Sequence, residues 1–517
     1  MIPGTGWAAV ENSASPAVRV PARCPAGQPT PFIPMARPST GRRTLILVAS
    51  LTVLMAALVL CVDRGLGGDM YMDLFTGRFI AEHGVVSHDP FPTVAQGQKW
   101  LNQQWLSQLL FFWVGWAVGL TGISIVYALL LAIPLGLLLW VCRRKGPWML
   151  LAIAALYFPG MLAVIHPRAA GFTVMAFSLL VILILAVWRA PLSQSGLGAR
   201  PRVALAVIVA LFAVWANLHG GFVAGLLLIG LVTAGLAVDR FRGLSEVVTS
   251  HRVAMLALAG VLGAAIASLA TPLGGQIWEY FQSFSNPAIR FASTEWLPAL
   301  QSVPAMGYLA VCAAFAGWLW WRSPRPRQIA PLLVALGFVA FAAFSMRNII
   351  FVAPALALQI AWAAPNRPDQ GLRAPIALAG TAAIGAVVAW AAVLGPAQAQ
   401  PQLRAPAVDY AIDHPPRAGR IATYAGTASY MLWRQPDTPV AIDGRLEHYT
   451  EGQLHDNYAI IRGLQADLTI PVEALDVTAA IVHVPRAIEI LEAHGFVREV
   501  TAPDGTYLVK RGECCAD

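Results

Sequence analysis

Charged residues are scarce in this sequence. Only 12% of its 517 residues are Asp, Glu, Lys or Arg, whereas 57% are hydrophobic. Apolar runs of about 17 to 24 residues recur along the chain, and each is long enough to cross a hydrocarbon layer roughly 30 Å thick as a helix. The shortage of charge therefore excludes a soluble enzyme of this length, and the runs predict an α-helical polytopic membrane protein.

The sequence also lacks the motifs of several enzyme and binding classes. It has no internal repeat, no phosphate-binding glycine loop and no nucleophile elbow, which argues against a cytoplasmic ATPase or kinase. Its six cysteines follow neither a metal-ligand spacing nor a disulfide pattern. The formal net charge of +8 comes mostly from arginines in short loops, where membrane topology accounts for it better than nucleic-acid binding does.

Arginine-rich loops predict the orientation of the spans. Residues 1–42, rich in Pro and Ala, are expected to be a disordered cytoplasmic tail. Six basic stretches hold most of the loop arginines, and the positive-inside rule places all of them in the cytoplasm. This placement requires the aromatic-rich stretch 105–119 to lie at the outer interface as a juxtamembrane helix instead of crossing. We then expect about eleven transmembrane helices, at 43–62, 120–141, 148–165, 170–188, 203–217, 221–238, 253–271, 305–321, 329–345, 348–364 and 375–394.

The composition changes after residue 395. Residues 420–449 alternate in a strand-like pattern, and the stretches "AAIVHV", "RAIEILEAHGF" and "GTYLVKR" are typical of a strand, a helix and a strand. We therefore expect a transmembrane domain over residues 43–395, with an outer loop at 63–119, and a small extracytoplasmic α/β domain over residues 396–517.

This orientation gathers ionisable groups on one side of the membrane. The stretch "GGDMYMDLFTGRFIAEHGVVSHDPF", residues 67–91, opens the outer loop with several carboxylates. Further polar stretches fall on the same side: "HPR" at 166–168, "NLHGG" at 217–221, "STEWLP" at 293–298 and "SMRN" at 345–348. Ionisable groups near hydrocarbon are costly and mark a functional cavity, although each of them taken singly is also explained by snorkelling or helix capping.

A carboxylate that faces arginines at a membrane surface suits transfer chemistry on a lipid-linked phosphate. The carboxylate can act as general base toward a hydroxyl. Guanidinium groups hold and neutralise a phosphate leaving group by charge-assisted hydrogen bonds. Glycosyl transfer from a polyprenyl-phosphate sugar needs this combination, and because the lipid tail would lie between helices, no nucleotide-binding fold is required.

The order of an acidic first outer loop, a juxtamembrane helix, many spans and an outer soluble domain resembles the GT-C glycosyltransferases. These lipid-phosphosugar-dependent membrane enzymes include protein mannosyltransferases, oligosaccharyltransferase subunits and aminoarabinose transferases. The resemblance implies a GT-C-like transmembrane fold, a polyprenyl-phosphate sugar donor among the membrane lipids, and a glycan, lipid or protein acceptor.

After residue 43 the chain is more closely similar to a group of bacterial polytopic membrane proteins that themselves resemble these enzymes. Their first loop follows an Asp-x-Trp-Trp-His-Leu-x-x-Gly-Arg pattern, then Asp-Pro-Phe and a Trp-x-x-x-x-Trp-Leu segment. The corresponding residues here are Asp69, Tyr71, Gly77, Arg78, Asp89, Pro90, Phe91, Trp100, Trp105 and Leu106. Asp73 stands where that pattern has His. The stretches "NLHGG", "EWLP", "MRN" and "DGRLEHY" are also similar to this group, which implies a bacterial inner membrane location.

Asp69 is the expected catalytic carboxylate, since it comes first in the loop, about one turn from the end of the first span. Asp73, one helical turn later, is expected to be its partner or a ligand of a divalent metal. The alternative is that both carboxylates only cap and solvate a loop helix. Arg347 and Arg168 are the candidates for the donor phosphate, whereas Asp89, which precedes a proline, is more typical of a turn.

Six further residues are candidates for substrate binding: His166, His219, Asn217, Glu295, Trp296 and Arg78. Glu295 with Trp296 would bind and stack on a sugar, although an interfacial aromatic residue is also a common membrane anchor. In "DGRLEH", we expect Asp443, Arg445 and His448 to be structural and to fix the outer domain on the cavity.

Two other functions stay open beside a glycosyltransferase. A transporter or flippase of lipid-linked glycans would more naturally show charged residues at mid-span or Gly/Pro-broken helices in matching halves, and the sequence shows no inverted repeat. A non-catalytic membrane assembly protein would keep the layout without the chemistry.

Overall fold

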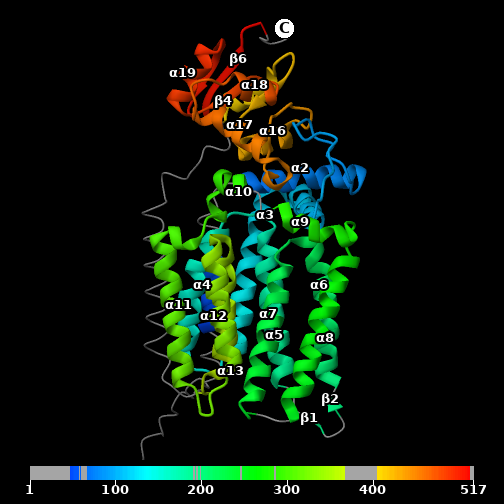
Figure 1. The fold of residues 1–517 in the computed structure, drawn as a ribbon, viewed down its shortest axis with the longest axis vertical. Helices are drawn as coiled ribbons and strands as arrows, with labels where there is room; N and C mark the ends of the chain where they lie inside the picture. Colours follow the sequence, from blue (N-terminus) through cyan, green and yellow to red (C-terminus); the bar gives the residue numbers. More distant parts are fainter. Residues whose placement is uncertain are drawn as a thin grey trace, which may run out of the picture. The chain divides into compact units, whose positions relative to one another are not determined.

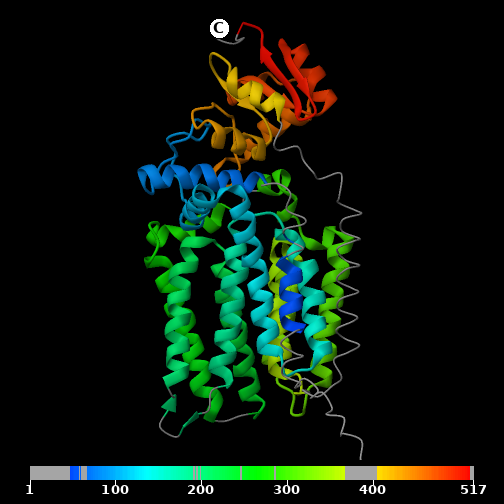
Figure 2. The ribbon, with the colours of Figure 1, turned by 180° about the vertical axis from the view of Figure 1, so that it is seen from behind.

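The computed structural model of the protein is drawn in Figures 1 and 2. It describes residues 47–56, 59, 67–189, 192–193, 196–197, 199–244, 247–283, 287–366 and 405–512. The expected tail at 1–42 and the last expected span at 375–394 lie outside these residues.

Apolar helices run side by side through most of the described chain (Figures 1 and 2). Six of them are long and apolar enough to cross a membrane: Trp105–Cys142, Pro147–Val164, Ala170–Val187, Phe222–Phe241, Val303–Arg322 and Met346–Ala363. Shorter apolar helices are Leu47–Ala56, Arg202–Leu218, Met255–Ala267 and Ala330–Phe344. Each of these helices overlaps one of the expected spans. Since the last expected span is not described, the total of about eleven stays a prediction.

The elements up to residue 363 are mostly helices. They are α2 (Gly68–His83), α3 (Trp105–Cys142), α4 (Pro147–Met161), α5 (Ala170–Arg189), α6 (Ala199–Leu218), α7 (Phe222–Phe241), α8 (Val247–Leu269), α9 (Ile277–Ser283), α10 (Pro287–Ala292), α11 (Val303–Arg322), α12 (Ala330–Phe344) and α13 (Val352–Ala363). Short 3₁₀ turns are η1 (Leu162–Val164), η2 (Gly274–Gln276), η3 (Thr294–Trp296), η4 (Ala299–Gln301) and η5 (Met346–Phe351). Two short strands, β1 (Leu192–Ser193) and β2 (Gly196–Leu197), pair antiparallel.

The helix α3 is broken at Gly119. The backbone there has φ 74° and ψ 178°, which is not helical. A positive φ of this kind is readily adopted only by glycine. The break separates residues 105–118 from the long apolar segment 120–142, and the two parts run in different directions (Figure 2). It falls at the boundary where the sequence predicts a juxtamembrane helix to end and a span to begin.

The helix α2 packs closely on the first part of α3. A side chain at Gly77 would lie 2.2 Å from the carbonyl oxygen of Gln108, so only glycine permits this approach. Met70, Leu74 and Phe111 are buried between the two helices and the bundle. The acidic helix of the outer loop is therefore held against the bundle along its apolar side.

Residues 405–512 form a mixed α/β region. Its helices are α15 (Pro406–Asp413), α16 (Ala425–Arg434), α17 (Glu451–Arg462), α18 (Thr469–Ala474) and α19 (Pro485–Ala493), with the turn η6 (Leu446–His448). Its strands are β3 (Arg420–Ala422), β4 (Val477–Val482), β5 (Phe496–Ala502) and β6 (Gly505–Lys510), in the order β3-β4-β6-β5. β3 pairs parallel with β4, and the other neighbours are antiparallel.

Both faces of this sheet are covered. Successive strand residues point to opposite faces, so Ala480 and Leu508 pack with α17, α18 and α19. Ala479 and Tyr507 pack instead with α15 and α16, and Met72 of α2 joins this second cluster. The α/β region therefore shares one of its apolar cores with the acidic helix of the outer loop.

A buried arginine ties the outer loop to the α/β region. Arg445 donates to both oxygens of Asp89, at 2.8 and 3.0 Å, and to both oxygens of Asp443, at 2.6 to 3.0 Å. Its guanidinium carbon also lies 4.8 Å from the ring centroid of Phe91 and 4.9 Å from that of Trp100. We call Asp89, Asp443 and Arg445 the buried clamp.

Arg445→Ala leaves two buried carboxylates without their cation. Removing one partner of a buried ion pair costs about 3–5 kcal/mol, so we expect a lower unfolding temperature and faster proteolysis of residues 405–512 in the full chain in detergent. Arg498→Ala is the matched control, because Arg498 pairs with Glu492 at the exposed surface. Equal unfolding temperatures for the two variants would contradict the role of the clamp.

Candidate active site

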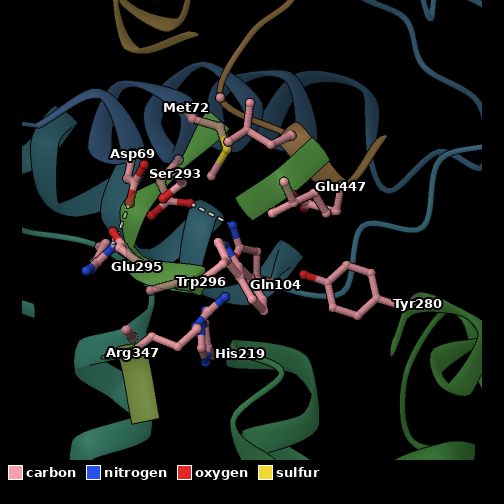
Figure 3. Close-up of a pocket in the computed structure, with 17 residues that line it drawn as sticks. Asp69, Met72, Gln104, His219, Tyr280, Ser293, Glu295, Trp296, Arg347 and Glu447 are labelled. Carbon is pink, nitrogen blue, oxygen red and sulfur yellow. Dashed lines mark hydrogen bonds and ion pairs between the residues drawn. The ribbon is translucent and has the colours of Figure 1, made fainter. Parts of the chain in front are cut away.

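One pocket gathers most of the predicted site residues. Seven of them line it: Asp69, Asp73, Arg168, His219, Glu295, Trp296 and Arg347. They come from α2, from the loop before α5, from the α6–α7 connection, and from the turns η3 and η5. Figure 3 shows Asp69 and Glu295 on one side of the pocket, Glu447 and Tyr280 on the other, and Arg347 with His219 below. Segments far apart in the sequence therefore meet around one polar space.

Arg168 is shared between two carboxylates. Its Nη1 lies 3.0 Å from Oδ2 of Asp69 and 2.5 Å from Oε1 of Glu295, and its Nη2 donates to the carbonyl oxygen of Ala163. Burial alone would lower the pKa of Arg168, but the charges of Glu295 and Asp69 outweigh it and raise the pKa. The side chain of Asp69 stays 52% exposed, against 15% for Arg168, so this carboxylate is oriented by the arginine and still opens to the pocket.

The two carboxylates of α2 lie in different environments. Asp73 is fully buried, and its Oδ1 accepts a hydrogen bond from Nε2 of Gln104 at 3.3 Å. Burial raises the pKa of Asp73 well above its ordinary range, and the neighbouring charge of Asp69 adds to this. Asp73 therefore suits a neutral hydrogen-bonding group, whereas Asp69 has the access that a base needs.

Arg347 and His219 lie together beside the indole of Trp296. The guanidinium carbon of Arg347 is 4.1 Å from the Trp296 ring centroid. Nδ1 of His219 accepts from the backbone N–H of Gly221 at 3.1 Å, which leaves Nε2 to carry the proton. Burial, followed by the charges of Arg347 and Arg168, lowers the pKa of His219 to about 3. His219 is thus a neutral hydrogen-bond donor near neutral pH.

An apolar cavity adjoins the polar pocket. It shares seven lining residues with the pocket: Arg168, Ala170, His219, Tyr280, Glu295, Trp296 and Arg347. The rest of its lining is mainly apolar and includes Val164, Val223, Ala224, Phe341, Ile350 and Phe351. A ligand with a charged head and a hydrocarbon tail would find a fitting environment for each end in these two spaces.

Two solved structures resemble this chain over most of its length. One is ArnT from Cupriavidus metallidurans bound to undecaprenyl phosphate, with a TM-score of 0.56 at 16% identity over 93% of this chain and 100% of that one. The other is the archaeal oligosaccharyltransferase AglB from Archaeoglobus fulgidus in complex with an inhibitory peptide and a dolichol-phosphate, with a TM-score of 0.54 at 12% identity over 90% of this chain and 74% of that one. The chain therefore has a GT-C-like fold. No protein-family model and no curated protein matches its sequence.

Three predicted substrate-binding residues do not line the pocket of this GT-C-like fold. Asn217 accepts from the indole N–H of Trp105 at 2.7 Å and donates to two backbone carbonyls, so it joins α6 to α3. Arg78 donates to the carbonyls of Leu432 and Trp433, which fastens α2 to α16. His166 lies beside Gly67 at the start of α2.

Sequence reasoning missed several residues that line the pocket, among them Gln104, Tyr280, Ser293 and Glu447. Glu447 is the most informative of these, because it comes from η6 of the α/β region and adds a carboxylate opposite Asp69 (Figure 3). Burial raises the pKa of Glu447. The sequence predicts a structural role for its neighbours in "DGRLEH". The position of the Glu447 carboxylate follows only from the contacts that Arg445 makes in the clamp.

A metal site is not evident in the described part of the chain. Among those residues no group of three or more His, Cys, Asp or Glu side chains is arranged to hold a metal ion. Asp73 as a ligand of a divalent metal therefore stays a prediction.

Asp73→Asn should change how stability depends on pH. A buried acid with a raised pKa stabilises the folded chain while it is protonated, and this contribution is lost as the pH rises through that pKa. Asn is neutral at every pH. The thermal stability of the variant should therefore equal that of the natural chain at about pH 4 and exceed it toward neutral pH. Thermal unfolding in detergent across a buffer series measures this, with Glu82→Gln, exposed on the same helix, as the control. Parallel curves for all three chains would contradict the burial argument.

Proposed function

We propose that the protein is a membrane glycosyltransferase that moves a sugar from a polyprenyl-phosphate donor to an extracytoplasmic glycan, lipid or protein acceptor. The observation that carries the proposal is one polar pocket where Asp69 faces Arg347 and His219, and which opens into an apolar cavity between helices. The GT-C-like fold supports it, since the two similar structures are bound to undecaprenyl phosphate and to a dolichol-phosphate.

The donor would bind across the two spaces. Its polyprenyl tail would lie in the apolar cavity beside Phe341 and Phe351, and its phosphate would reach Arg347 and His219. A planar guanidinium offers a phosphate two parallel N–H bonds, and the neutral imidazole of His219 adds a donor without adding charge. The sugar would then project toward Asp69 and Glu295 in the polar pocket.

Asp69 would act as general base in the transfer. Its carboxylate removes the proton from an acceptor hydroxyl while that oxygen forms a bond to the anomeric carbon of the donor sugar. The bond from the anomeric carbon to the phosphate oxygen breaks, and the polyprenyl phosphate leaves with the electron pair. Arg347 would balance the charge that develops on the leaving phosphate. Arg168 holds Asp69 in place for this step.

The pocket and residues 396–517 would lie outside the cytoplasmic membrane of a bacterium, with the N-terminus inside. Support comes from the positive-inside rule, since Arg143, Arg144, Arg242 and Arg325 lie in connections between apolar helices that contribute no residue to the pocket. The transmembrane domain at 43–395 would hold the donor, and the α/β domain would close the pocket with Glu447.

Asp69→Asn should abolish transfer while leaving folding and donor binding nearly intact. A positioned base contributes roughly 10²- to 10⁴-fold to the rate, and Asn keeps the shape but not the charge. The measurement is transfer to an acceptor by purified protein or complementation of a deletion strain. Glu82→Gln removes an exposed carboxylate from the same helix and should keep full activity. Full transfer by Asp69→Asn would overturn the mechanism in this form.

Arg347→Ala should weaken donor binding far more than Arg325→Ala, which removes an exposed arginine outside the pocket. A hydrogen bond to a charged group contributes about 1.5–3 kcal/mol, so we expect roughly a ten- to hundredfold loss in affinity for a polyprenyl phosphate. Arg347→Lys should recover only part of it, because a point charge lacks the bidentate fork. Equal binding by all of these variants would remove Arg347 from the donor site.

A further inference from the structure

A second cavity lies at the N-terminal end of α2, on a different face of this helix from the active-site pocket. Its lining includes six residues of mixed character, Tyr71, Tyr424, Thr427, Tyr430, His483 and Asp504, and we call it the tyrosine cavity. Tyr71 belongs to the first-loop motif that contains Asp69, yet it does not line the pocket of Asp69. The two cavities share none of their lining residues.

Helix geometry explains why neighbouring residues of α2 serve different cavities. Asp69, Met72 and Asp73 follow the i, i+3, i+4 pattern of one helix face and line the active-site pocket. Gly68 and Tyr71, three residues apart, lie on another face of α2 and line the tyrosine cavity together with residues of α16. A side chain at Gly68 would lie 2.4 Å from the Cα of Gly426, so both helices can approach this closely only as glycines.

Several polar groups of the tyrosine cavity have no hydrogen-bond partner among the described residues. Within the described residues, the hydroxyls of Tyr71, Tyr424 and Thr427 and the ring nitrogens of His483 make no hydrogen bond. Tyr71 nevertheless is only 7% exposed, and its ring meets that of Tyr430 edge to face, with centroids 5.0 Å apart. Half-enclosed hydroxyls without protein partners are what a hydrogen-bonding ligand would satisfy.

The remaining polar groups of this cavity are already engaged. The hydroxyl of Tyr430 accepts from Nη1 of Arg434 at 2.9 Å. The carboxylate of Asp504 accepts from the backbone N–H groups of Ala407 and Val408 at 3.0 to 3.2 Å, at the start of α15. Asp504 is therefore occupied as a helix cap.

The chemistry of the lining selects one class of ligand. No Lys or Arg lines the described cavity, and the nearby Arg434 is already paired with Asp409 and Tyr430, so an anion would find no free countercharge. The engaged Asp504 leaves no carboxylate for a cation. Phenol rings favour apolar C–H surface, and the unused hydroxyls and imidazole favour a ligand rich in hydroxyl groups. A neutral saccharide combines these two properties.

We propose that the tyrosine cavity is a saccharide-binding site separate from the active-site pocket. It holds a sugar ring against the tyrosines while Tyr71, Tyr424 and His483 exchange hydrogen bonds with its hydroxyls. That this saccharide is part of the acceptor, which would then be an oligosaccharide, rests on the proposed function.

Binding is tested on the full chain in detergent by calorimetric titration with methyl glycosides of glucose, galactose, mannose and N-acetylglucosamine, and with their trisaccharides. We expect at least one probe to bind, and the double variant Tyr71→Phe with His483→Ala to weaken that probe about tenfold or more. His455→Ala is the matched control, since this exposed histidine does not line the cavity, and it should bind as the natural chain does.

Two results would overturn the proposal: no probe binding up to about 20 mM, or equal binding by the natural chain and the double variant. Asp69→Asn separates this proposal from the proposed function, because it should keep saccharide binding while losing transfer. If the double variant loses saccharide binding but keeps transfer, the tyrosine cavity is still a saccharide-binding site, but its ligand is not part of the acceptor. Absence of transfer in the natural chain, with saccharide binding intact, would remove the proposed function and leave the saccharide site standing.

Discussion

The buried clamp is the interaction on which the arrangement of the site depends. Arg445 engages Asp89 from the outer loop and Asp443 from the α/β region, with side-chain exposures of only 2% or less. Two buried carboxylates satisfy the donors of one guanidinium, and moving either element away would leave an unpaired buried charge, so these contacts favour this placement of the loop against the α/β region. Because Glu447 follows Arg445 by two residues, this placement also brings its carboxylate to the pocket.

Within the pocket, two carboxylates of the same helix differ in how deeply they are buried. Asp69 and Asp73 lie one helical turn apart, but the first is half exposed beside Arg168 and the second is enclosed behind it. Desolvation disfavours the charged form of a buried acid, so the same residue type provides an accessible carboxylate at one position and a proton-holding group at the other. The two arginines of the pocket differ in their partners instead: Arg168 lies between two carboxylates, whereas Arg347 lies over an aromatic ring.

Much of the fold can be predicted from the sequence, because the hydropathy of a segment and the charge of its flanking loops are local properties. It anticipates the break near residue 119 and gathers Asp69, Arg168 and Arg347 on one side of a GT-C-like bundle. It does not separate Asn217 and Arg78, which tether helices, from residues that line the pocket, because a polar side chain at a helix end is compatible with either role. Glu447 lacks a local signal altogether, since its place follows from pairing between Arg445 and a loop far away in the chain.

The clamp also has a consequence for the order in which the protein matures. Chains are made from the N-terminus, so every described membrane helix precedes the segment that contains Arg445 and Glu447. The helices that border the apolar cavity can therefore insert and pack while the wall opposite Asp69 is still missing. The pocket is complete only when the last part of the chain has folded against residues 63–119, so until then Asp69 and the apolar cavity lack the residues that η6 contributes to the wall facing them.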